Sequence, residues 1–105
     1  MITEFSENKF NQFIKEKKLF VVDFFAVWCG PCKMFAPVYK EGSDQYASKG
    51  FTFLKVDVDE HTNFAANQGV TSVPTIVIYK DGKEFNRWSG ATNLENFKKR
   101  LDEAL

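Results

Sequence analysis

Cysteine is scarce in this sequence. Only 2 of its 105 residues are cysteines, and they lie at positions 29 and 32. That number is too small for a secreted scaffold held together by several disulfides. A disulfide across so short a loop would also remove little entropy from the unfolded chain, so stabilisation is a weak reason for the pair. We therefore expect the two cysteines to carry chemistry.

Net charge and long apolar runs are absent as well. The 14 Lys and Arg residues balance 14 Asp and Glu residues, which leaves no overall field to attract nucleic acid. No run of about 18 apolar residues occurs, and the first residues lack the basic and apolar regions of a signal peptide. The single histidine, His61, lies in a polar stretch, and no second cysteine pair completes a metal site. We expect a cytoplasmic protein that binds neither nucleic acid, nor membrane, nor metal.

The hydrophobic pattern predicts one α/β domain over residues 1–105, without linkers or internal repeats. We expect helices at 7–17, 32–47 and 63–67, a last helix behind a capping box of Thr92 and Glu95, and strands at 19–27, 51–58, 75–79 and 83–88. Strands separated by helices should pair in parallel, and the Asp81-Gly82 turn predicts an antiparallel hairpin. The expected fold is a three-layer α/β/α sandwich with four helices and a mixed central sheet of about five strands.

The segment Trp28-Cys29-Gly30-Pro31-Cys32 lies where the first expected strand ends and a helix begins. Reactive groups of open α/β sheets usually lie at this end of a strand. Cys29 occupies the helix cap, where free backbone amides and the helix dipole favour a thiolate, so we expect it to be the nucleophile. Cys32, one turn further, should be shielded and placed to resolve a mixed disulfide at Cys29. Half of a zinc site and a purely structural disulfide are the weaker alternatives.

Three other positions leave alternatives open. Asp23 is the one acid within an apolar strand, where burial raises the pKa of a carboxyl group; the alternative is an acid hydrogen-bonded to backbone at a strand end. Pro74 precedes an apolar strand, either as an ordinary trans proline at the strand start or with an unusual geometry. Trp28 either lines a groove beside Cys29 or belongs to the core, as most aromatic side chains do.

These features lie within segments that extend over nearly the whole chain: VVDFFAVWCGPCK at 21–33, AP at 36–37, KVDVD at 55–59, VPT at 73–75, DG at 81–82 and SGA at 89–91. Together they resemble the thioredoxin family, and the acidic segment VDVDE at 56–60 is more similar to its eukaryotic cytosolic type. The resemblance implies the thioredoxin fold. It also implies a protein-disulfide reductase that exchanges the Cys29/Cys32 dithiol for disulfides in partner proteins and maintains cell redox homeostasis.

The resemblance also assigns roles to individual residues. Asp23 would exchange a proton with Cys32, with Lys55 modulating its charge. Trp28, Gly30 and Pro31 would form the active-site loop around the redox disulfide Cys29–Cys32. The peptide bond before Pro74 would be cis. A small apolar groove for substrate proteins would be lined by Trp28, Val73, Pro74, Gly90 and Ala91.

No bound cofactor is implied, because electrons would come from NADPH through a flavoprotein thioredoxin reductase. Oxidised partners would include peroxiredoxin, ribonucleotide reductase and methionine sulfoxide reductase, and the protein would be a monomer. A disulfide oxidase or isomerase and a non-catalytic thioredoxin-fold binding module are the alternatives. Gly30-Pro31 resembles the reductase, since oxidases and isomerases of this fold commonly have histidine before the second cysteine.

One position departs from the family pattern. Gly42 falls on the inward stripe of the second expected helix, where thioredoxins usually have an aliphatic side chain. Glycine within a helix costs about 0.5–1 kcal/mol relative to alanine. We expect a neighbouring phenylalanine to fill the space at this position.

Overall fold

The computed structural model describes all residues, 1–105. In chain order, its elements are α1 (Glu7–Lys15), β1 (Phe20–Phe25), α2 (Gly30–Tyr46), the short 3-10 helix η1 (Ala47–Lys49), β2 (Thr52–Asp57), α3 (Thr62–Asn67), β3 (Thr75–Lys80), β4 (Lys83–Ser89) and α4 (Leu94–Glu103). Each helix and strand for which the sequence predicts a residue range is present, but a fifth strand is not.

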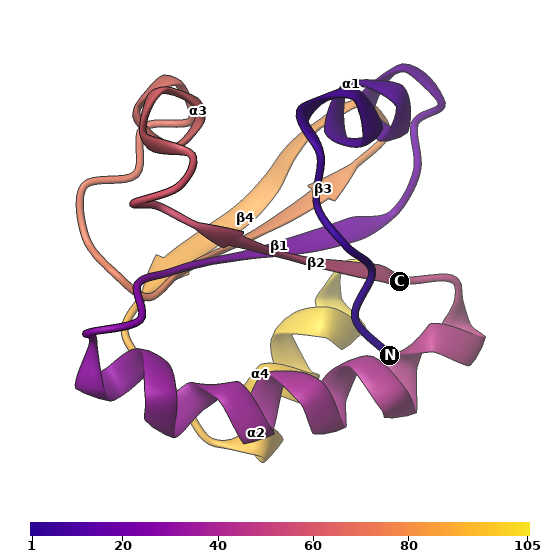
Figure 1. The fold of residues 1–105 in the computed structure, drawn as a ribbon. Helices are drawn as coiled ribbons and strands as arrows, with labels where there is room; N and C mark the ends of the chain where they lie inside the picture. The colour runs from indigo at the N-terminus through magenta and orange to yellow at the C-terminus, as the bar shows by residue number, and fades with distance from the viewer.

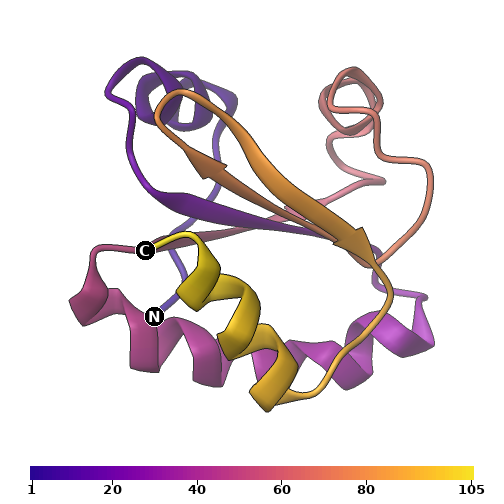
Figure 2. The ribbon, with the colours of Figure 1, turned by 180° about the vertical axis from the view of Figure 1, so that it is seen from behind.

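Helices cover both faces of the sheet. Figure 1 and Figure 2, from opposite sides, show α1 and α3 on one face and α2 and α4 on the other. A hydrophobic core lies on each face of the sheet, and successive residues of β1 point into the two cores alternately. Phe20 and Val22 pack with α1 and α3, whereas Val21 packs with α2 and α4. Because both faces of β1 are covered, its sequence is almost continuously apolar. The predicted three-layer sandwich is confirmed.

The sheet has the strand order β2-β1-β3-β4 and is mixed. β1 and β2 pair in parallel, as expected for strands joined by a helix, and β3 and β4 form the expected antiparallel hairpin. β3, however, pairs antiparallel with β1, which corrects the expectation that all helix-separated strands are parallel. α3 is only about 9 Å long, roughly half the length of a six-residue strand. It stays at the end of the sheet where β2 finishes, so β3 starts from that end and runs back (Figure 1).

The sheet has four strands where about five were expected. A single residue, Thr3, forms an isolated parallel bridge with Leu54, and its amide donates to the Phe53 carbonyl at 2.7 Å. This bridge lies at the outer edge of β2. One bridged residue covers part of that edge without forming a strand.

The end of α1 and the start of α4 differ from the expected positions for identifiable reasons. α1 ends at Lys15 instead of residue 17, because Lys17 has a left-handed backbone with φ 57°. α4 is capped by Asn93, whose side chain accepts a hydrogen bond from the Asn96 amide at 2.8 Å, and not by Thr92. Asparagine is at least as good an N-cap as threonine, which explains the shift of one residue.

Gly42 is buried against α4, as the sequence predicted. A Cβ atom at this position would lie 2.5 Å from Phe97 Cε2 and 2.7 Å from Phe97 Cδ2. The Phe97 ring is fully buried and also packs against Phe35, Tyr39 and Trp88, so it has little room to move. The phenylalanine fills the space that a side chain at residue 42 would need.

Gly42→Ala is therefore expected to destabilise the protein. Alanine would gain about 0.5–1 kcal/mol of helix propensity, but overpacking a well-packed core costs about 1–3 kcal/mol. We expect a net loss of about 1 kcal/mol in the free energy of unfolding, measured by urea denaturation. Glu41→Ala, at the preceding exposed position of α2, is the control and should change stability little. A Gly42→Ala variant more stable than the wild type would contradict this account.

Candidate active site

The cysteine pair lies at the junction between β1 and α2, as predicted. Cys29 is the N-cap of α2, with extended backbone, and its sulfur accepts a hydrogen bond from the Cys32 amide at 3.1 Å. Pro31 fits into the first turn because amides there have no helical acceptor. This cap places Cys29 Sγ at the positive end of a 17-residue helix, where negative charge is stabilised.

Cys29 and Cys32 form a disulfide, so the structure shows the oxidised state. Their Cα atoms are 5.2 Å apart, which the first turn of a helix provides without distortion. Cys32 is shielded from water as expected, at 5% exposed, but Cys29 is equally shielded at 4%. The two residues differ in what they line. Cys29 lines a groove of about 490 Å³, whereas Cys32 lines a separate hollow of about 200 Å³.

Trp28 forms one wall of the groove beside Cys29. Its side chain is 68% exposed, which excludes the alternative that it belongs to the core. The indole Nε1 donates a hydrogen bond to Asp59 Oδ2 at 2.8 Å, so the ring is held in place from its polar edge. The remaining lining residues are Gly30, Pro31, Val58, Val70, Thr71, Ser72 and Val73. The groove is thus mainly apolar, with hydroxyl groups on one side.

Val73 brings a backbone carbonyl close to the disulfide: its oxygen lies 3.7 Å from Cys29 Sγ. The Val73–Pro74 peptide bond is cis, as the resemblance implied. Thr75 Oγ1 donates to the Ser72 carbonyl at 2.6 Å, and the Gly90 amide donates to the Pro74 carbonyl at 2.9 Å. Of the five residues expected in the groove, Trp28 and Val73 line it. Pro74, Gly90 and Ala91 are not among its lining residues, although Gly90 fixes the backbone next to Val73.

Asp23 lies in the middle of β1 and is 1% exposed. Its carboxylate accepts no hydrogen bond, and its Oδ1 is fully buried without a partner, so the backbone-bonded alternative does not apply. Burial raises the pKa of Asp23 to about 7, and the positive charge of Lys55 opposes this rise in pKa. Lys55 is the register partner of Asp23 on β2, and its Nζ lies over the Phe25 ring at 4.5 Å from the centroid.

Lys55 also connects Asp23 to the cysteines in space. The hollow that contains Cys32 is lined by Lys55 together with Phe25, Ala26, Val27, Lys33 and Ala36. Lys55 thus lines the same hollow as Cys32 and is also the register partner of Asp23. The groove beside Cys29 is a separate space that shares no lining residue with this hollow. The arrangement allows a docked chain to meet Cys29 while proton transfer takes place near Cys32.

Comparison with known proteins gives a consistent result. The family model described as Thioredoxin matches residues 1–103. The chain belongs to the thioredoxin family. It is 44% identical to "Thioredoxin-1" of Saccharomyces cerevisiae over 87% of each chain, and 45% identical to "Thioredoxin" of Staphylococcus aureus over 81% of each chain.

A solved structure on the thiol resolving mechanism of yeast mitochondrial 1-Cys peroxiredoxin via glutathione/thioredoxin systems contains a similar chain. That chain is 35% identical, with a TM-score of 0.85, and the match covers 97% of this chain and 94% of that one. Thioredoxins are thiol–disulfide oxidoreductases, and the Cys29–Cys32 disulfide is the redox-active pair that this activity requires. Similar identities to yeast and bacterial thioredoxins leave the eukaryotic cytosolic type a prediction.

Several groove residues escaped the sequence analysis of this thioredoxin. Val58 follows β2, Val70 to Ser72 follow α3, and none of them carries a signal of its own. They line the groove because α3 turns the chain back toward Cys29, which is a property of the tertiary fold. The adjacency of Ser72 to Val73 was the one available indication. Asp59, the partner of Trp28, lies 31 residues away in sequence.

The structure also shows the surroundings of His61 and the character of the helices. No group of three or more His, Cys, Asp or Glu side chains is arranged to hold a metal ion. His61 instead packs edge-on against Phe5, with ring centroids 4.9 Å apart. None of the helices combines the length and the apolar character needed to cross a bilayer.

Proposed function

We propose that this thioredoxin is a single-domain, monomeric protein-disulfide reductase that acts through Cys29. The observation that carries the proposal is the position of Cys29, which caps α2, lines the apolar groove and is bonded to Cys32. In the reduced protein, the Cys29 thiolate attacks one sulfur of a partner's disulfide. That disulfide breaks, a mixed disulfide with Cys29 forms, and the partner's other sulfur leaves as a thiolate that takes up a proton.

The second step releases the partner. Cys32 gives its proton to the Asp23 carboxylate, and the resulting Cys32 thiolate attacks Cys29 Sγ. The mixed disulfide breaks, the Cys29–Cys32 disulfide forms, and the partner leaves as a dithiol. The partner has then gained the two electrons that the cysteine pair has lost. Lys55 modulates the charge of Asp23.

Recognition of partners rests on the groove. Trp28, Val73 and the neighbouring backbone of Pro74, Gly90 and Ala91 would contact an extended segment of the partner through main-chain and apolar contacts. Such contacts demand little sequence specificity. The absence of net charge suits a protein that docks on partners of differing charge.

Electrons would return to the disulfide from NADPH through a flavoprotein thioredoxin reductase, in the cytoplasm. The chain similar to one in the yeast peroxiredoxin structure supports peroxiredoxin as an oxidised partner. Ribonucleotide reductase and methionine sulfoxide reductase belong to the same class of partner by family resemblance. The test is a coupled assay of NADPH oxidation with the reductase and insulin, in which an intact protein without turnover would refute the reductase proposal.

Cys32→Ser should trap partners on the protein. The variant keeps the attacking Cys29 but has no thiol to resolve the mixed disulfide, so partner proteins are expected to accumulate as covalent adducts. The adducts are identified by mass spectrometry before and after reduction. Partners recovered equally from the wild type, or bound without a disulfide to Cys29, would contradict the assigned roles.

A further inference from the structure

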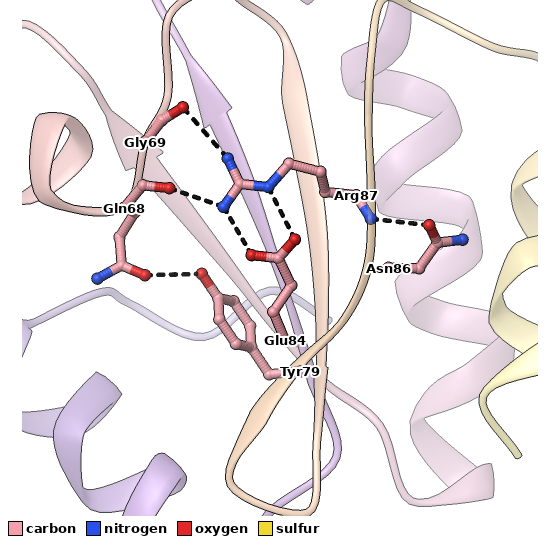
Figure 3. A network of polar contacts seen from close by, with 6 residues as sticks. All are labelled: Gln68, Gly69, Tyr79, Glu84, Asn86 and Arg87. Carbon is pink, nitrogen blue, oxygen red and sulfur yellow. Dashed lines mark hydrogen bonds and ion pairs between the residues drawn. The ribbon is translucent and has the colours of Figure 1, made fainter.

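One wall of the groove depends on a polar network remote from the cysteines. The wall consists of Val70 to Val73, which follow α3 and belong to no helix or strand. It begins at the two residues after α3, Gln68 and Gly69. Figure 3 shows that side chains of β3 and β4 bind both of these residues.

Arg87 of β4 makes the main contacts. Its Nη2 donates to the Gln68 carbonyl at 2.7 Å and its Nη1 to the Gly69 carbonyl at 3.3 Å. Tyr79 of β3 adds a third contact, because its hydroxyl donates to Gln68 Oε1 at 3.2 Å (Figure 3). Neither the Gln68 carbonyl nor the Gly69 carbonyl accepts a hydrogen bond from a backbone amide. The amides of residues 68–70 bond back to carbonyls of α3, and the side chains of Arg87 and Tyr79 add the bonds that tie this start of the wall to the sheet.

Glu84 holds the Arg87 side chain in this orientation. Its Oε2 accepts from Arg87 Nε at 3.0 Å and its Oε1 from Arg87 Nη2 at 2.8 Å, a two-point contact that fixes the guanidinium plane. The planar guanidinium serves a carboxylate and two carbonyl groups at once, which a lysine ammonium does not match. This pairing also raises the pKa of Arg87, which therefore stays charged.

A β-bulge makes the pairing of Glu84 with Arg87 feasible. Residues three apart in a regular strand point to opposite faces of the sheet. In β4 the register shifts: Asn86 pairs with Ile78 and Glu84 with Tyr79, which leaves Phe85 without a partner. The extra residue turns Glu84 onto the same face as Arg87. Bulges are a known way to re-aim a side chain near a functional site.

The other end of the wall is fixed independently. The Thr75 hydroxyl binds the Ser72 carbonyl, and the Gly90 amide binds the Pro74 carbonyl. The Val73 carbonyl, 3.7 Å from Cys29 Sγ, lies between the two anchors. Any loosening at Gln68 and Gly69 would therefore shift Val70 and Thr71 first, because these two groove residues lie between the anchored ends.

We propose that Arg87, aligned by the bulge and by Glu84, is a positioning residue that fixes the Val70–Val73 wall and so sets how tightly partner proteins bind beside Cys29. The inference rests on the proposed function, since it assumes that partners dock in this groove. It assigns no part of the thiol chemistry to Arg87. Loss of the network should weaken docking and leave the reactivity of the cysteines unchanged.

The test compares a protein disulfide with a small one in single-turnover oxidation of the pre-reduced protein. Arg87→Ala is expected to raise the half-saturating insulin concentration about 3- to 10-fold, the equivalent of about one lost hydrogen bond, with the maximal rate within about twofold. The rate constant for bis(2-hydroxyethyl) disulfide, which is too small to extend along the wall from Cys29, should stay unchanged. Arg87→Lys keeps the positive charge but not the planar guanidinium that binds Glu84 and two carbonyl groups at once. It should therefore restore little of the insulin affinity.

Arg100→Ala is the matched control. Arg100 is the chain's only other arginine, and it stacks over the Trp88 ring at 4.4 Å, away from Gln68 and Gly69. This variant loses the same charge and should not change the insulin dependence. A second measurement is independent of activity: nuclear magnetic resonance order parameters of Val70 and Thr71 should fall in Arg87→Ala and not in Arg100→Ala.

The outcomes separate the two proposals. An Arg87→Ala protein with wild-type insulin affinity, or with equal losses for insulin and the small disulfide, would overturn the positioning role. Unchanged order parameters of Val70 and Thr71 would do so as well. A wild-type protein that reduces no insulin would refute the reductase proposal itself, whatever the Arg87 variants do.

Discussion

Cys29→Ser is expected to lower protein-disulfide reduction by more than about 10³-fold, because removal of a covalent nucleophile eliminates the reaction path. Serine has nearly the same shape, but its hydroxyl is not ionised near neutral pH and does not form a mixed disulfide. The measurement is NADPH oxidation in the coupled assay with insulin. The covalent adduct that Cys32→Ser forms with a partner should be absent from Cys29→Ser.

The loss of activity should not arise from unfolding. Serine is among the best N-cap residues, so it keeps a side-chain acceptor for the Cys32 amide at the start of α2. Reduced Cys29→Ser and reduced wild-type protein should therefore unfold at similar urea concentrations. Reduced proteins are compared because the variant lacks the disulfide. A Cys29→Ser protein that still forms adducts, now through Cys32, would show that the order of attack is the reverse of the one proposed.

The chemistry of the site could be predicted from the sequence because it depends on local geometry. A strand, a cap and a first helical turn are encoded within residues 19–33, and they place Cys29 and Cys32 at disulfide distance without any distant contact. Asp23 could be identified for the same reason, since an acid inside an apolar strand is conspicuous. The family resemblance then added the cis bond before Pro74, which the residues alone left open.

The groove could be predicted only in part because its walls come from separate elements. Val58 follows β2 and Val70 follows α3, and only the packing of α3 at the end of the sheet brings them to Cys29. The hydrogen bonds of Arg87 to Gln68 depend on a single unpaired residue, Phe85. This residue reverses the alternation of side chains between the two faces of β4. A bulge of this kind leaves little trace in a short strand. The Glu84–Arg87 pair was therefore invisible to a period-2 pattern.

The predictions of strand number and of the direction of β3 were wrong for a related reason. Local patterns indicate where strands lie, but not which edge a returning strand joins. Because α3 is short, β3 runs antiparallel to β1. In the sequence, the same six residues resemble an ordinary helix that connects two parallel strands. The expected fifth strand is reduced to the bridge of Thr3 with Leu54.

Asp23→Asn is expected to stabilise the protein strongly at high pH. The folded protein keeps a proton on Asp23 up to a pKa of about 7, whereas the unfolded chain releases it near 3.8. Between these values the folded state binds more protons, so its stability is greatest below about pH 4 and falls as pH rises through about 7. The interval corresponds to a loss of about 4 kcal/mol that asparagine, which does not ionise, avoids.

Urea denaturation of the oxidised proteins from pH 4 to pH 8 measures this effect. The difference in unfolding free energy between Asp23→Asn and wild type should be smallest near pH 4 and grow to as much as about 4 kcal/mol at pH 8. Glu103→Gln, at an exposed position of α4, is the control and should show no such trend. A difference that does not change with pH would mean that Asp23 does not titrate in this window.

The same substitution should slow the step that needs a proton acceptor and leave the first step alone. A reduced protein that meets an aromatic disulfide releases one chromophoric thiol when Cys29 attacks and a second when Cys32 resolves the adduct. Asparagine accepts no proton, so Asp23→Asn should slow the second release by about 10- to 100-fold near pH 7, at or below the lower end of general acid–base effects. The wild-type rate of the second release should change with pH around 7, where Asp23 titrates. A second release with an unchanged pH profile in Asp23→Asn would remove Asp23 from the proton transfer, even if the stability prediction held, because burial alone accounts for the stability effect.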